Sequence, residues 1–136
     1  MKKTILFIFY IFLNVSGFAQ PASGFTFSVP DVMPQFKGGT AELLEYINQQ
    51  IIFSDEDKEK NVAGELIITF TVDKSGTLSD ITIKKGISSS IDLELIRIIR
   101  AMPLWIPGRI NRENVTSKFS LSLMIDAGQQ KVNSVL

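Results

Sequence analysis

The sequence predicts an α+β domain: a three-stranded antiparallel or mixed sheet, in the order 2-1-3, with two helices packed on one face. Two alternating apolar runs joined by a tight turn indicate a hairpin. Apolar residues at helical spacing indicate one helix before the hairpin and one after it, and a third alternating run follows. A right-handed crossover through the second helix places the third strand beside the first.

The composition fits a single globular domain and excludes several classes of protein. Of the 136 residues, 45% are hydrophobic, and 14 basic residues balance 14 acidic ones. No basic field therefore favours nucleic acid as a partner. Cysteine and histidine are absent, which excludes disulfides, thiol nucleophiles, imidazole bases and the metal sites that these residues form. We expect a protein that is not an enzyme and that has no cofactor and no metal.

Residues 1–19 have the pattern of a secretory signal peptide. Lys2 and Lys3 precede an apolar stretch, and small residues lead up to a cleavage site between Ala19 and Gln20. The apolar residues 4–15 would span about 18 Å as a helix, less than the roughly 30 Å of a hydrocarbon core. We expect an exported, periplasmic protein. The alternative is a protein that an uncleaved N-terminus anchors in the inner membrane.

A lead-in segment and a helix follow the signal peptide. In the lead-in, residues 20–31, Phe25 and Phe27 alternate with polar residues as in a short strand that ends at Val29. The domain itself is expected to cover residues 32–126. Thr40 is expected to cap its first helix. The apolar residues of that helix have helical spacing: Leu43, Leu44, Ile47 and Ile51.

The charged run at residues 54–61 is interpreted as a solvated turn or an irregular helical end. It lacks the glycine that a calcium-binding loop requires. The hairpin comes next. Its first strand covers residues 65–73, its turn places Gly76 at a positive φ, and its second strand ends near Lys85.

The second helix and the third strand complete the predicted domain. Ser88, Ser89 and Ser90 offer an N-cap, with Asp92 as the reciprocal partner of Ser89. Pro103 ends this helix. Trp105 is expected to fill the core between the helix and the sheet. A polar turn at residues 109–114 then leads into the alternating run 115–125, and residues 127–136 are expected to be a mobile tail.

The third strand is expected to form a long free edge of the sheet, which invites pairing. Across this edge the only charge is Lys118, and proline is absent. The edge is covered by the chain's own tail, paired in a homodimer, or offered to a partner, and the sequence leaves these alternatives open. The candidate partner-binding residues are Thr116, Ser117, Lys118, Phe119, Ser120, Leu121 and Ser122.

Three stretches resemble TonB C-terminal-like domains: residues 33–39, residues 64–76, and residues 102–108 with their Trp-x-Pro-Gly element. The resemblance covers residues 32–126 and implies the α+β fold described above. It also implies a periplasmic module that pairs its edge strand with the TonB box, a short segment of an outer-membrane transporter, and so serves transport across the membrane. The alternative is a structural or regulatory envelope domain that dimerises through this edge or binds another periplasmic protein.

Three features depart from the family pattern. The sequence shows no clear spanning anchor and no Pro-rich spacer. Phe53 and Ser54 stand where the family commonly has Tyr-Pro, and the last strand has Ser122 and Ile125 in place of a proline and a closing Phe. Mechanical energy transduction requires a link to the inner-membrane motor, so the first departure argues against that role. Binding is compatible with all three.

Overall fold

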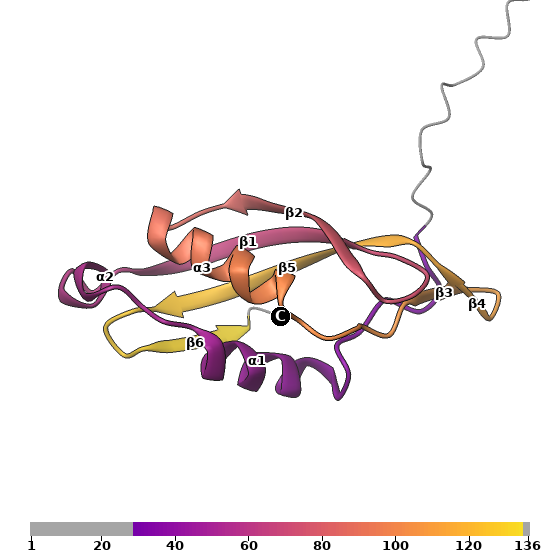
Figure 1. Cartoon of the computed structure of the whole chain (residues 1–136), viewed down its shortest axis with the longest axis horizontal. Coiled ribbons are helices and arrows are strands. Elements are labelled where there is room, and N and C mark those ends of the chain that lie inside the picture. Colours follow the sequence, from indigo (N-terminus) through magenta and orange to yellow (C-terminus); the bar gives the residue numbers. More distant parts are fainter. Residues whose placement is uncertain (1–28, 135–136) are drawn as a thin grey trace, which may run out of the picture.

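The computed structural model describes residues 29–134 and has a four-stranded antiparallel sheet at its centre, in the order β2-β1-β5-β6 (Figure 1). Two helices, α1 and α3, contribute to the same hydrophobic core on one face of this sheet. The α+β prediction is confirmed, and the predicted third strand does lie beside the first. The elements of this layer are α1 (Gly39–Gln50), β1 (Ala63–Val72), β2 (Leu78–Lys85), α3 (Ser89–Arg100), β5 (Ser117–Asp126) and β6 (Lys131–Ser134).

The central strand β1 buries the face that its sequence pattern predicts. It pairs with β5 over ten residues without interruption, from Ala63 opposite Asp126 to Val72 opposite Ser117. Its alternate apolar residues face the helices and are buried: Leu66, Ile68, Phe70 and Val72. Side chains alternate between the two faces of a strand, so this period-2 pattern was sufficient to place β1 in the core.

The sheet has one strand more than predicted, and this changes the expected edge. Residues Lys131–Ser134 form β6, so the prediction of a mobile tail from Ala127 onward is wrong for this segment. β6 pairs with the second half of β5, from Leu123 to Asp126. The free edge of the third strand is therefore shorter than expected.

The cap of α1 differs from the prediction, and the cap of α3 is the first of the three serines that were predicted. Gly38, with a φ of 96°, is the N-cap of α1, and no side chain caps this helix, so the assignment of Thr40 was wrong. Ser88 caps α3: its Oγ accepts a hydrogen bond from the backbone N–H of Ile91. Asp92 is a reciprocal partner, but its carboxylate accepts from the N–H of Ile87, one residue before the cap.

The predicted polar turn at residues 109–114 is a small hairpin of β3 (Gly108–Ile110) and β4 (Glu113–Val115). The end of the lead-in is tied to this region by two antiparallel bridges, Val32 with Arg109 and Gln35 with Ile106. The signal peptide and the strand pattern at Phe25 and Phe27 lie outside the described residues. Within residues 29–134, no helix has the length and apolar character needed to cross a membrane.

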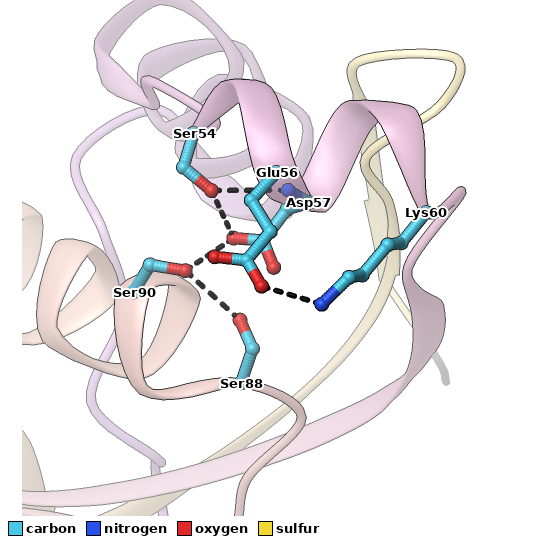
Figure 2. A network of polar contacts seen from close by, with 6 residues as sticks. All are labelled: Ser54, Glu56, Asp57, Lys60, Ser88 and Ser90. Atoms are coloured by element: carbon cyan, nitrogen blue, oxygen red, sulfur yellow. Dashed lines mark hydrogen bonds and ion pairs between the residues drawn. The ribbon is translucent and has the colours of Figure 1, made fainter.

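The charged run contains a short helix, α2 (Asp55–Glu59), whose residue Asp57 takes part in a network of polar contacts (Figure 2). Asp57 is only 4% exposed, so the interpretation of a fully solvated run is wrong at this residue. Its carboxylate accepts hydrogen bonds from the hydroxyls of Ser54, at 2.7 Å, and Ser90. The hydroxyl of Ser90 in turn contacts that of Ser88. These hydrogen bonds connect α2 to the first turn of α3.

The same hydrogen bonds set the charge state of Asp57. The hydroxyl of Ser90, followed by that of Ser54, holds the pKa of the Asp57 carboxyl below its ordinary value, against the opposing effect of burial. Asp57 is therefore a buried anion that the two serines stabilise.

Candidate functional site

The outer side of β5 is the candidate site, because β6 covers only part of it. Within the described residues, no strand pairs with the outer side of the β5 segment from Ser117 to Ser122. Its inner side is paired with β1 throughout. We call residues 117–122 the open edge.

The far side of β6 is closed by a side chain of α1. Asn48 accepts a hydrogen bond from the backbone N–H of Val132 through Oδ1 and donates one to its C=O through Nδ2, both at 2.9 Å. The side-chain amide of Asn48 thus takes the place that a neighbouring strand would have at Val132. The backbone polar groups of Val132 therefore point away from β5.

This contact determines which backbone groups of β5 point outward. In an antiparallel ladder both polar groups of a residue point to the same side, and the side alternates along the strand. Since Val132 points away from β5, Asn133 points toward it and faces Met124. Met124 therefore points outward, and so do the other even-numbered residues of β5, Ser122, Ser120 and Lys118.

The odd-numbered residues of β5 point toward β1, and a separate contact agrees with this assignment. The N–H of Ala127, in the same series, donates to the C=O of Val62 at 2.9 Å, on the β1 side. The backbone groups of Ser117, Phe119 and Leu121 are therefore used inside the sheet.

The side chains of the seven candidate residues divide in the same way. Ser117 and Leu121 are buried and Phe119 is half-buried on the helix-covered face, whereas Lys118 and Ser120 are exposed on the opposite face. Lys118 lines a polar hollow there, together with Asp80 and Lys84. The other two, Thr116 and Ser122, are half-buried, and Thr116 precedes the strand. Only part of the candidate set can therefore meet a partner through side chains.

An aromatic cluster supports the helix-covered side of the open edge. The ring of Phe119 lies 5.1 Å from that of Trp105 and 5.6 Å from that of Phe70, measured between ring centroids. Trp105 is only 3% exposed, which confirms the prediction that it fills the core. The cluster fixes β5 at the point where its outer side is open.

A pocket of about 300 Å³ lies next to this cluster. It is bounded by the lead-in, by the first turns of α1 and by the aromatic rings. The residues that line it are Met33, Pro34, Gln35, Phe36, Gly39, Thr40, Leu43, Trp105 and Phe119. Among residues 29–134, no group of three or more carboxylates is arranged to hold a metal ion.

The sequence analysis missed Asn48 and β6, which together define the open edge. The segment after Asp126 did contain a turn signal, since Asp126 and Gly128 are residues that favour turns. Indeed the carboxylate of Asp126 accepts a hydrogen bond from the N–H of Gln129. No sequence pattern relates Asn48 to Val132, because they lie far apart in the chain and meet only in the folded protein.

The comparisons with known proteins identify one family. Residues 49–124 match the family model described as Gram-negative bacterial TonB protein C-terminal, which is more than half of the chain. This range runs from the end of α1 through β1, β2 and α3 into β5. No curated protein and no solved structure matches the chain.

Proposed function

The chain belongs to the family of Gram-negative bacterial TonB C-terminal domains, and on this basis we propose a specific binding mode for it. The family supports a protein-interaction role in the Gram-negative envelope, connected with transport. We propose that this chain is a periplasmic module whose open edge pairs with an extended segment, resembling a TonB box, of an outer-membrane transporter. The observation that carries the proposal is the outer side of β5, which β6 leaves open along residues 117–122.

The open edge provides enough backbone groups for modest affinity. Two outward residues, Ser120 and Ser122, present an N–H and a C=O each, so an added strand could form about four hydrogen bonds with them. At about 0.5 to 1.5 kcal/mol each, these contribute about 2 to 6 kcal/mol. Ordering the peptide and losing its translational freedom oppose this gain. We expect an isolated peptide to bind no more tightly than about micromolar.

A short peptide fits the open edge better than a second copy of this chain does. If β5 paired antiparallel with itself about Ser120, the second copy's Ser117 would stand opposite Leu123. That place is already taken by Ser134 of β6. A homodimer centred on Ser120 would have to displace the end of β6, whereas a six-residue segment along residues 117–122 would not.

We also propose that the chain acts by binding alone. It contains no cysteine and no histidine, and the open edge offers backbone groups rather than a set of acids and bases.

A proline substitution tests the proposed edge. In Ser120→Pro, the lost N–H is one that points outward, so the pairing with β1 should survive, as it does for prolines on natural edge strands. Titration with a TonB-box peptide should show binding to wild type and to Ser120→Ala, and none to Ser120→Pro. Circular dichroism confirms that both variants are folded. Undiminished binding by folded Ser120→Pro would reject edge pairing, and absence of binding by wild type would favour the structural or regulatory role.

A further inference from the structure

We propose that the pocket beside Phe119 binds one apolar side chain of the strand that pairs with the open edge. This inference rests on the proposed function and adds a chemical requirement: the partner segment must carry a large apolar residue at the position opposite Phe119.

The pocket lies where an added strand would run. Asn48, near the end of α1, holds β6 at Val132, opposite Ile125. The first turns of the same helix line the pocket together with Phe119. The pocket therefore lies between α1 and β5 in the direction in which β6 would continue along β5.

The register directs one side chain of the added strand toward this pocket. Directly paired residues on neighbouring strands place their side chains on the same face of the sheet. The residue opposite Phe119 would therefore point to the helix-covered face, as Phe119 does. Its neighbour opposite Ser120 would make backbone hydrogen bonds with the open edge.

The position opposite Phe119 lies beyond the reach of β6. Ser134 stands opposite Leu123. Phe119 lies four residues further along β5, so an added strand can place a residue opposite Phe119 without displacing β6 as far as Ser134.

The large apolar residues of the pocket favour an apolar occupant, and the polar residues Gln35 and Thr40 also line it. Its walls include the side chains of Phe36, Leu43, Trp105 and Phe119, with Met33 at 46% exposure. Its volume of about 300 Å³ exceeds the roughly 150 Å³ of an engineered apolar cavity that holds benzene. A leucine or phenylalanine side chain fits this volume.

A serine scan of a TonB-box peptide tests the pocket. Each peptide residue is changed to serine in turn and the affinity for the full chain is measured. We expect one apolar position at which serine weakens binding about tenfold or more. In Thr40→Trp, a large side chain at an exposed residue of α1 blocks the pocket. Serine at the sensitive position of the peptide should then not weaken the binding to Thr40→Trp any further. The control is Glu45→Trp, an exposed residue of α1 that does not line the pocket.

The outcomes separate the pocket from the proposed function. Equal effects of serine at every position would reject the pocket while edge pairing stands. An effect at one position that persists in full in Thr40→Trp would also reject it. Absence of binding by the unchanged peptide would reject the proposed function itself.

Cross-linking gives an independent measurement of the same contact. Because the chain has no cysteine, Met33→Cys provides a single thiol at the pocket. A peptide with cysteine at the sensitive position, activated beforehand as a disulfide with a small thiol, should exchange with the Met33→Cys thiol to form a mixed disulfide and release the small thiol. It should not do so with Leu93→Cys, whose side chain is 67% exposed on α3. Equal cross-linking of both variants would contradict the proposed geometry.

Discussion

At the scale of single residues, the hairpin turn depends on Gly76. Its φ is 88°, and a Cβ added there would lie 2.0 Å from the backbone oxygen of Trp105. The C=O of Gly76 also accepts a hydrogen bond from the N–H of Trp105 at 2.9 Å. The glycine is therefore required both for the turn and for the close approach of the segment that carries Trp105.

We expect Gly76→Ala to destabilise the protein much more than Gly39→Ala. Both glycines have a positive φ, which costs an L-residue about 1 to 2 kcal/mol, but a Cβ at Gly39 meets nothing within 4 Å. The difference between the two variants isolates the clash with Trp105. Urea unfolding measures this difference in stability. Equal free energies of unfolding for the two variants would show that the segment at Trp105 moves away from the added Cβ at little energetic cost.

The buried carboxylate of Asp57 makes a second prediction at this scale. Because its pKa is lower in the folded protein than in the unfolded chain, it stabilises the fold above about pH 4. This contribution is lost as the pH falls through the folded-state pKa. Asp57→Ala should lower the free energy of unfolding by about 1.5 to 3 kcal/mol at pH 7, which is the value of a hydrogen bond to a charged group.

The test for Asp57 is the pH dependence of unfolding. The difference in free energy between wild type and Asp57→Ala should shrink as the pH is lowered below about 4. Glu59 is an exposed acid in the same helix, and Glu59→Ala serves as the control. This variant should change neither the free energy of unfolding nor its pH dependence by much. A difference that stays constant with pH would mean that Asp57 contributes through packing and not through its charge.

At the scale of elements, β6 depends on its contact with α1. In Asn48→Ala, the N–H and C=O of Val132 lose their partner while Val132 itself is only 1% exposed. Such a loss costs about 1 to 3 kcal/mol. Gln49→Ala is the matched control, because the Gln49 amide bonds only to Glu45 within the same helix. Thermal unfolding of both variants measures the cost, and equal midpoints would show that water replaces Asn48 at Val132.

The sequence predicted those elements whose own pattern is sufficient. The ten residues of β1 alternate cleanly, and α3 has a full apolar stripe between a serine-rich start and Pro103. β6 has four residues and one buried apolar side chain, which is too little for a periodic signal. Its stability comes from β5 and Asn48, so it could not be found before the fold was known.

Only part of the candidate site could be predicted from the sequence, for the same reason. The sequence located the open edge on the third strand but could not give its length, since that depends on β6. The sequence could not give the direction of the backbone groups either. The alternation of a strand allows either the even-numbered or the odd-numbered residues of β5 to point outward, and one contact in the folded protein is needed to decide between them. Asn48 and Val132 provide that contact.

At the scale of the whole molecule, amide hydrogen exchange tests the assignment directly. The N–H groups of Phe119 and Leu121 are bonded within the sheet and should exchange slowly, at the rate set by opening of the core. Those of Ser120 and Ser122 point outward along the open edge and should exchange much faster. Addition of a TonB-box peptide should slow the exchange of Ser120 and Ser122 and leave that of Phe119 and Leu121 nearly unchanged. If Phe119 and Leu121 were the fast pair, the register of the outward groups would be wrong. If the peptide protected neither serine, it would bind elsewhere on the molecule.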